Sequence, residues 1–504
     1  MNRRAYLADM GMGCAGIALG SMLCRDNITR ANPVASGQTQ PNGTPHHVAK
    51  AKSVIWIFLS GGVSQMESFD PKPALNKYAG KSFTDTPFVD PLKSPLFVKH
   101  SRDVIGGTRP YPKIFPMQVG YKKYGQLGME VSDWFPHLAR QVDKMAFVRS
   151  MYTTDNDHGA EFQMHTGRHQ LDEQQPVVGS WISYGLGSLN ENLPQFVFLG
   201  KYTDIRVKKN MSADYLGPRH TGVELSLDPG NPLPFATREA GVTEIQQREQ
   251  FRLIEQFDRL AAARYPDDPQ VLARIKGYEL AFRMQRAMPD ALDLGRETAS
   301  TNKLYGIDDP NTAIYGRRLL AARRLAERGV RFNLVYLSDY GEWDSHNDLK
   351  NLHGRSAARV DKPLAGLIQD LERTGLDQET LVVCCTEFGR TPGLETRDAY
   401  KMPTGRDHHP HGFTVWFYGA GVQRGVVHGA TDEFGFHAVE SPHYVTDIHA
   451  TVLDRMGLDP RRLVIPGRKR LDIDFGDPIR AICSEPAVEF TPCSSNRTGC
   501  LEPK

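Results

Sequence analysis

Three shortages in the sequence each exclude a class of protein. Only seven cysteines occur among 504 residues and no histidine follows residue 449, so the cysteine-containing end of the chain lacks the pattern of a zinc knuckle. Beyond residue 30, no apolar run approaches the roughly 20 residues that a membrane-spanning helix requires. The net charge is only +2, from 61 Lys and Arg against 59 Asp and Glu, which gives no electrostatic reason to expect a nucleic-acid partner.

The rest of the composition is that of a soluble globular protein. Hydrophobic residues make up 40% of the chain and charged residues 24%. The length allows a large hydrophobic core and exceeds that of a usual single domain. Cys384 and Cys385 lie in an apolar run, where we expect inert, buried thiols. Two of Cys483, Cys493 and Cys500 are able to pair if the compartment is oxidising.

The N-terminus resembles a twin-arginine export signal. Arg3 and Arg4 precede an apolar pair and then a weakly hydrophobic, Gly- and Ala-rich run from 10 to 23. We therefore predict a signal peptide at 1–35, followed by a polar, turn-rich linker at 36–50. A short buried helix with a basic start is the alternative. The signal predicts a periplasmic or extracellular protein whose mature chain has no transmembrane segment.

Strands and helices alternate along the remaining chain. Apolar runs predict strands at 54–60, 144–151, 195–200, 331–337, 380–386 and 413–420. Helical spacing predicts helices at 315–330, about 356–374 and 441–457, and a mostly helical insertion at about 236–300. Strands that are apolar throughout are typical of a mostly parallel sheet with helices on both faces. We assign 51–475 to this single α/β domain and 476–504 to a cysteine-containing tail.

Histidines and carboxylates gather where the predicted strands end, which is where α/β sheets form their sites. His158 follows the strand at 144–151, and the stretch EWDSHND follows the strand at 331–337. In an extended chain, side chains repeat every two residues, so Asp344 and His346 point the same way. Carboxylates and imidazoles that converge from separate loops are ligands for a divalent metal. The candidate ligands are Asp344, His346, Glu387, Asp407, His408 and His409, the last three from the stretch GRDHHPHG.

Structural roles are alternatives for several of these residues. Asp344 is able to cap the helix that follows it. Glu387 is able to form a buried ion pair with Arg390 or Arg406. Adjacent histidines at the entrance of a strand are typical of a ligand site or of a hydrogen-bond network.

Motifs in a fixed order resemble those of one protein family. They are FLSGGVSQMESFDPKP, ARRLAERGVRF, EWDSHND, TLVVCCTEFGRTP, GRDHHPHGFTVWFYGAG and DIHATVLDRMGLDP, and they extend from about residue 53 to 460. Together with the twin-arginine start they resemble the DUF1501 family of exported bacterial proteins. That family belongs to the alkaline phosphatase/sulfatase-like superfamily. The resemblance implies an α/β three-layer sandwich with a mostly parallel central sheet, an alkaline phosphatase-like core and a helical insertion.

The resemblance also implies a site with one or two divalent metals, with Zn, Ca, Mg and Mn left open. The superfamily's Asp…His pair matches Asp344 and His346, its Asp-His pair matches Glu387-Phe388, and its last histidine matches His408 or His409. Two departures matter. The first strand ends in Ser60 without the superfamily's aspartate, and no well-placed hydroxyl nucleophile precedes Thr166. A Cys-x-Pro-x-Arg stretch is also missing, so a formylglycine sulfatase mechanism is not supported.

These residues predict metal-assisted hydrolysis of a sulfate or phosphate ester without a covalent intermediate. The substrate would be a small molecule or a polysaccharide. His158 would act as general acid or base, and Arg390 or Arg406 would hold the sulfate or phosphate oxygens through its planar guanidinium. The alternative is a fold that has lost catalysis and serves as a periplasmic or surface polysaccharide-binding module. The two departures above favour that alternative.

Overall fold

The computed structural model describes most of the chain after the linker. These residues are 41–100, 111–200, 211–227, 243–264, 287–396, 403–465 and 470–484, with positions 280, 283–284 and 467–468 between them. The signal peptide predicted at 1–35 lies outside this range, as do Cys493 and Cys500. Cys483 is buried and forms no disulfide with another cysteine of the described residues. None of the helices in the described part is both long and apolar enough to cross a membrane.

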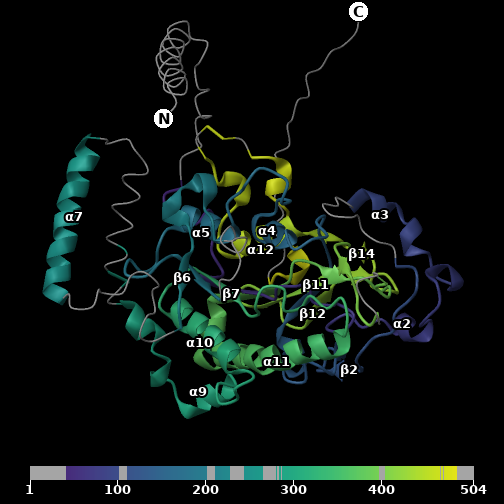
Figure 1. The fold of residues 1–504 in the computed structure, drawn as a ribbon. Helices are drawn as coiled ribbons and strands as arrows, with labels where there is room; N and C mark the ends of the chain where they lie inside the picture. Colours follow the sequence, from purple (N-terminus) through teal and green to yellow (C-terminus); the bar gives the residue numbers. More distant parts are fainter. Residues whose placement is uncertain are drawn as a thin grey trace, which may run out of the picture.

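A nine-stranded sheet forms the centre of the molecule (Figure 1). Its strands are β1 (Ser53–Phe58), β4 (Ala146–Tyr152), β5 (Phe196–Leu199), β6 (Val223–Leu225), β7 (Phe332–Tyr336), β8 (Thr380–Cys385), β11 (Phe413–Gly419), β12 (Val426–His428) and β15 (His443–Tyr444). Their order is β12-β4-β11-β8-β1-β7-β5-β6, and β15 also pairs with β4. Within this sheet, β11 is antiparallel to β4 and β8, whereas the other pairings are parallel.

Helices cover both faces of the sheet and complete three layers (Figure 1). One face carries α4 (Ala160–Thr166), α5 (Val178–Leu186) and α12 (Val445–Arg455), and the other carries α9 (Ala299–Leu304), α10 (Ala313–Glu327) and α11 (Leu349–Thr374). The predicted fold class, an α/β three-layer arrangement around a mostly parallel sheet, is confirmed. α11 begins seven residues before the predicted start and ends at Gly375, as expected.

The side chains of the central strands alternate between two hydrophobic cores. In β1, Val54, Trp56 and Phe58 pack in the core under α5 and α12. Ile55 and Ile57 pack in the opposite core, under α10 and α11. Because each central strand is buried on both faces, its sequence is a continuous apolar run rather than an alternating one.

Smaller elements surround this core. Three short strand pairs form separately: β2 (Tyr121–Tyr124) with β3 (Met129–Ser132), β9 (Gly389–Arg390) with β10 (His408–His409), and β13 (Ala430–Thr431) with β14 (Ala438–Glu440). The helices α2 (Pro73–Lys77) and α3 (Pro95–His100) lie between β1 and β2 in the chain. In the predicted insertion, α7 (Glu244–Arg264) lies to one side of the sheet (Figure 1).

The direction of β11 explains why a stretch that precedes a strand joins the loops that follow the others. Phe413 at the start of β11 pairs with Met151 near the end of β4, and Trp416 pairs with Cys384 near the end of β8. The amino end of β11 therefore lies at the sheet edge where the parallel strands end. This places GRDHHPHG beside the loops after β4, β7 and β8.

The turn after β1 packs directly against the loop that carries Asp344. Gly61 has a φ of +120°, a backbone conformation that residues with a side chain rarely adopt. A Cβ on Gly61 would lie 2.6 Å from the backbone nitrogens of Trp343 and Asp344. Trp343 N donates a hydrogen bond of 3.0 Å to the carbonyl oxygen of Ser60. The tight turn at Gly61 thus fixes the backbone of the Asp344 loop.

Substituting Gly61→Ala should destabilise the protein by about 3 kcal/mol or more, because it adds a backbone clash to an unfavourable φ. Gly128→Ala is the matched control, because Gly128 also has a positive φ, +63°, but a Cβ there meets nothing within 4 Å. We expect the control to cost only about 1 kcal/mol. Denaturant unfolding measures both. Equal losses in the two variants would contradict the proposed contact.

Candidate metal centre

Five polar side chains meet at the edge where the parallel strands end. His158 follows β4, Asp344 and His346 follow β7, and Asp407 and His408 lie just before β11. We call these five residues the His/Asp cluster. Two groups of three within it, His158 with Asp344 and His408, and His346 with Asp407 and His408, have ligand atoms within 4.8 Å of one another. Gly405 permits the approach, since a Cβ there would lie 2.2 Å from the carbonyl of His346.

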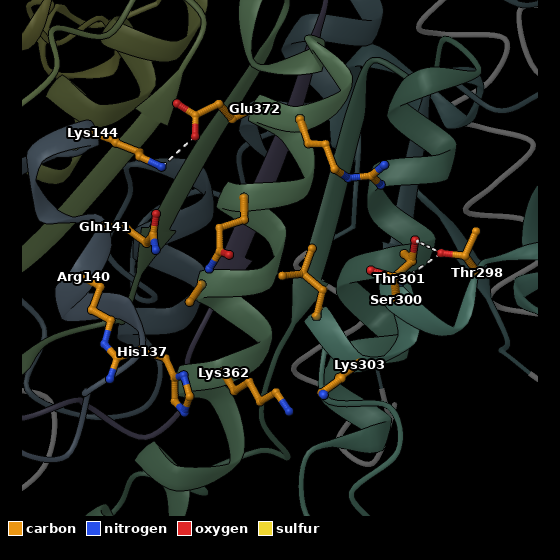
Figure 2. A pocket seen from close by; sticks show the side chains of 14 residues that line it. His137, Arg140, Gln141, Lys144, Thr298, Ser300, Thr301, Lys303, Lys362 and Glu372 are labelled. Atoms are coloured by element: carbon orange, nitrogen blue, oxygen red, sulfur yellow. Dashed lines mark hydrogen bonds and ion pairs between the residues drawn. The ribbon is translucent and has the colours of Figure 1, made fainter.

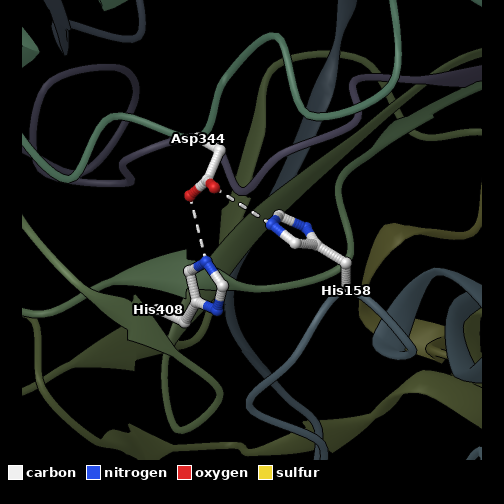
Figure 3. Close-up of side chains that lie close together, drawn as sticks. All are labelled: His158, Asp344 and His408. Atoms are coloured by element: carbon white, nitrogen blue, oxygen red, sulfur yellow. Dashed lines mark hydrogen bonds and ion pairs between the residues drawn. The ribbon is translucent and has the colours of Figure 1, made fainter.

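The carboxylate of Asp344 is at the centre of the cluster. Its Oδ1 lies 2.9 Å from Nε2 of His346 and 3.0 Å from Nε2 of His408. Its Oδ2 lies 3.2 Å from Nε2 of His158, and Figure 3 shows His158 and His408 pointing at the same carboxylate. The guanidinium of Arg390 donates to Oδ1 at 2.8 Å from the buried side. Three imidazoles from three separate loops thus present the same ring nitrogen to one carboxylate.

An acceptor holds the other ring nitrogen of each histidine. Nδ1 of His346 lies 2.6 Å from Oε2 of Glu395. Nδ1 of His158 lies 3.1 Å from Oε1 of Glu387, and Nδ1 of His408 lies 2.8 Å from the carbonyl oxygen of Asn156. Metal-ligating histidines in proteins are oriented in this way, with one nitrogen donating to a carboxylate or carbonyl and the other turned to the ion.

His408 shows most clearly that the cluster fits a cation. The carbonyl of Asn156 only accepts, so the Nδ1 of His408 must carry a proton. Burial lowers the pKa of His408, which favours the neutral ring. In a neutral ring Nε2 is then an acceptor, and it faces another acceptor, Oδ1 of Asp344. Two acceptors at 3.0 Å repel each other unless a cation binds both, so the donor set fits a divalent metal.

The other charges in the cluster are strongly coupled. Burial alone would raise the pKa of Asp344, but Arg390 and the imidazoles of His158 and His346 hold it well below its usual range. Burial alone would lower the pKa of His158, but the carboxylates at both of its ring nitrogens raise it to about 10. The pKa of His346 is raised in the same way, against the effect of burial. The raised pKa of His346 favours a ring proton at Nε2 that a metal ion bound there would displace.

The cluster is open to solvent on one side. The side chain of Asp344 is 26% exposed, and those of His158 and His408 are 13% and 11% exposed. The side chains behind them, Glu387 and Arg390, are fully buried. A ligand from solvent therefore reaches the cluster from the Asp344 side.

Two other candidate ligands lie around the cluster rather than in it. Glu387 accepts from the backbone N–H of Gly61 at 2.7 Å and contacts the cluster through His158. His409 points away, with Nε2 2.5 Å from the carbonyl oxygen of Phe436, and burial lowers its pKa to about 3. Of the two adjacent histidines, His408 is therefore the one that faces Asp344.

Both arginines predicted to hold an oxyanion are fully buried and bonded within the protein. Arg390 donates to Asp344 and to four backbone carbonyls. Arg406 pairs with Glu67, with Nη2 2.7 Å from Oε1, and donates to four further carbonyls. Neither guanidinium faces solvent. Their contacts are those of groups that hold loops together.

Two structural alternatives are wrong. Asp348, not Asp344, stands at the start of α11. Among the described residues, Glu387 forms no ion pair with an arginine, because Arg390 pairs with Asp344 and Arg406 with Glu67.

Sequence reasoning missed three buried carboxylates. Glu395 orients His346 and lies in the loop after β8, so its place after a strand was the available signal. Glu67 neutralises Arg406. Glu161 accepts from Ser60 Oγ, just after β1, and burial raises the pKa of Glu161 to about 8. Glu67 and Glu161 lie far in sequence from their partners, and no local pattern predicts such pairs.

The fold and the site define a three-layer α/β protein with a carboxylate–imidazole centre at the edge of its sheet. The chain belongs to the DUF1501 family, "Protein of unknown function (DUF1501)", which matches residues 51–482. No curated protein matches the sequence.

Several solved structures resemble the fold at low identity. Lipoteichoic acid synthase LtaP from Listeria monocytogenes is 9% identical, with 88% of this chain and 80% of that chain covered and a TM-score of 0.38. An alkaline phosphatase superfamily protein from Vibrio parahaemolyticus is 11% identical, with 84% and 72% covered and a TM-score of 0.35. Phosphonate monoester hydrolase SpPMH from Silicibacter pomeroyi is 13% identical, with 71% and 73% covered and a TM-score of 0.33. Likenesses of this size assign no reaction to the chain.

Substituting Arg406→Met should cost about 3–5 kcal/mol of stability, because it leaves the fully buried Glu67 without its partner. Arg296→Met is the control, since its ion pair with Asp290 is largely exposed and is worth about 1 kcal/mol or less. Chemical denaturation of both variants provides the measurement. If Arg406→Met left stability unchanged and instead weakened the binding of a sulfate or phosphate ester, the structural role would be refuted.

Proposed function

We propose that the protein is an exported, metal-dependent hydrolase of sulfate or phosphate esters. The observation that carries this proposal is the triad of imidazoles, each held at Nδ1 by an acceptor and turned with Nε2 toward the carboxylate of Asp344. Such an arrangement in a solvent-accessible edge of an α/β sheet is typical of a catalytic metal site rather than of a structural ion pair.

Asp344, His346 and His408 would hold the ion, with Asp407 beside them. A mixture of imidazole and carboxylate ligands suits zinc better than calcium or magnesium. When bound, the cation would polarise an ester oxygen and stabilise the negative charge that develops during hydrolysis. Glu395 and the carbonyl of Asn156 would keep the two ring planes in place.

His158 is the residue best placed to transfer a proton. Its Nδ1–H is held by the buried carboxylate of Glu387, and its Nε2 lies at the exposed side of the cluster. The negative charge on both sides of the ring keeps a proton available at neutral pH. We assign it the protonation of the leaving alcohol oxygen, as a general acid.

Water is the nucleophile in this proposal. The hydroxyls closest in sequence to His158 are turned elsewhere: Thr153 Oγ1 donates to Gln163 at 2.6 Å, and Thr154 Oγ1 accepts from the same side chain at 2.8 Å. Ser60 Oγ donates to Glu161. These contacts favour direct hydrolysis over a covalent intermediate.

The test is metal content and turnover of the purified protein and its variants. The wild type should contain about one ion per chain and cleave an aryl sulfate or aryl phosphate. His408→Ala should lose most of the ion and lower turnover by roughly 100-fold or more. His158→Ala should keep the ion but lower turnover by roughly 100- to 10,000-fold.

His428→Ala is the control, because His428 lies on β12 outside the cluster and should change neither property. A folded wild-type protein that turns over without metal would sink the proposal. If the wild type instead retains metal and a sulfated polysaccharide but never cleaves an ester, the non-catalytic binding module is the better account.

A further inference from the structure

A second concave site lies between three segments that do not contribute to the cluster (Figure 2). It is formed by the segment Leu138–Lys144, the helix α9 with the residue before it, and the C-terminal half of α11. Its volume is about 830 Å³, a size that accommodates several sugar rings or a ligand of similar bulk.

The cleft is strongly basic although the whole chain is nearly neutral. Five of its lining side chains are Lys or Arg and one is acidic, namely Arg140, Lys144, Lys303, Lys362 and Arg373 against Glu372. Concave surfaces lined by one sign of charge concentrate ligands of the opposite sign. The lining therefore favours an anion.

Two of these cations form ion pairs within the protein and three do not. Lys144 pairs with Glu372 at 2.6 Å, and Arg373 pairs with Asp370 at 2.5 Å. In the part of the chain that the structure describes, Arg140, Lys303 and Lys362 form no ion pair with a carboxylate. In Figure 2 the ammonium groups of Lys303 and Lys362 point toward one another across the cleft. Two like charges that line one cleft and have no ion-pair partner among the described residues favour an anion there.

The remaining lining identifies the kind of anion. Hydroxyls of Thr298, Ser300 and Thr301 and amides of Gln141 and Gln369 lie among the cations. These groups donate and accept hydrogen bonds, as the hydroxyls of a sugar require. The lining contains no Phe, Tyr or Trp ring on which a nucleic-acid base would stack. The chemistry therefore fits a charged sugar chain better than a nucleic acid.

We propose that this basic cleft binds a sulfated or phosphorylated oligosaccharide. Lys303, Lys362 and Arg140 hold its anionic groups, and Ser300, Gln141 and Gln369 bind its sugar hydroxyls. Lys362 and Arg373 lie 13 and 24 residues beyond the start of α11, which is about 20 and 36 Å along the helix axis. Because Asp344 precedes that start, the cleft is a site separate from the His/Asp cluster and does not depend on hydrolysis.

Binding of a sulfated hexasaccharide to the full chain, measured by calorimetry, tests the proposal. Affinity should fall as salt is added, because screening weakens contacts between exposed charges. The double variant Lys303→Glu/Lys362→Glu should bind roughly tenfold more weakly or worse. Lys350→Glu/Arg355→Glu, the same charge change at exposed positions near the start of α11, should bind as the wild type does.

Further measurements distinguish binding in the basic cleft from binding at the His/Asp cluster and from unspecific attraction between charges. His408→Ala should still bind the hexasaccharide, so a failed hydrolase proposal leaves this one standing. When the hexasaccharide is bound, hydrogen exchange on the wild type should show protection at 137–144, 298–304 and 362–373. This measurement tests the proposal even if a variant fails to fold. The proposal is overturned if both double variants bind alike, or if an uncharged hexasaccharide binds equally. It is also overturned if inorganic sulfate or a single-stranded oligonucleotide of matched charge binds as tightly.

Discussion

The carboxylate of Asp344 is the contact on which the rest of the site depends. Three imidazoles and one guanidinium converge on its two oxygens, from four different segments of the chain. Arg390 extends this network, because the same guanidinium also donates to the carbonyls of Gly61, Gly62, Trp343 and Arg406. One fully buried side chain therefore ties the β1 turn and the loop before β11 to the loop that carries the carboxylate. The five N–H groups of arginine in a fixed plane make this possible, and lysine lacks that geometry.

Much of the residue set of the site could be predicted from the sequence, whereas the contacts between individual atoms could not. Four residues of the site could be predicted because they lie beside strands, namely His158, Asp344, His346 and His408. These strands can be recognised in the sequence because a strand buried on both faces is a continuous apolar run. The direction of β11 carries no signal in its own residues, yet it decides that the stretch before it joins the site. The roles of Arg390 and Arg406 were also hidden, because their acceptors are mostly backbone carbonyls, which every residue has.

The two adjacent histidines before β11 also show how far the sequence alone can assign positions. His408 and His409 are neighbours in sequence, and in an extended chain neighbours point to opposite sides. His408 therefore reaches Asp344, while His409 is buried against the carbonyl of Phe436. The alternation of side chains is predictable, but which of the two faces the site depends on the pairing of His408 with Arg390 and His409 with Gly389. That register is a tertiary property.

The central claim is that a metal ion binds in the His/Asp cluster and displaces the ring proton that His346 directs at Asp344. Calorimetric titration of the metal-free protein with Zn²⁺ at pH 7, in buffers of different ionisation enthalpy, counts the protons released. Because His158 keeps its proton as the general acid, the raised pKa of His346 predicts about one proton released per ion bound, and His408→Ala should abolish most of that release. Binding of zinc with no release of protons, or an unchanged release in His408→Ala, would contradict the account.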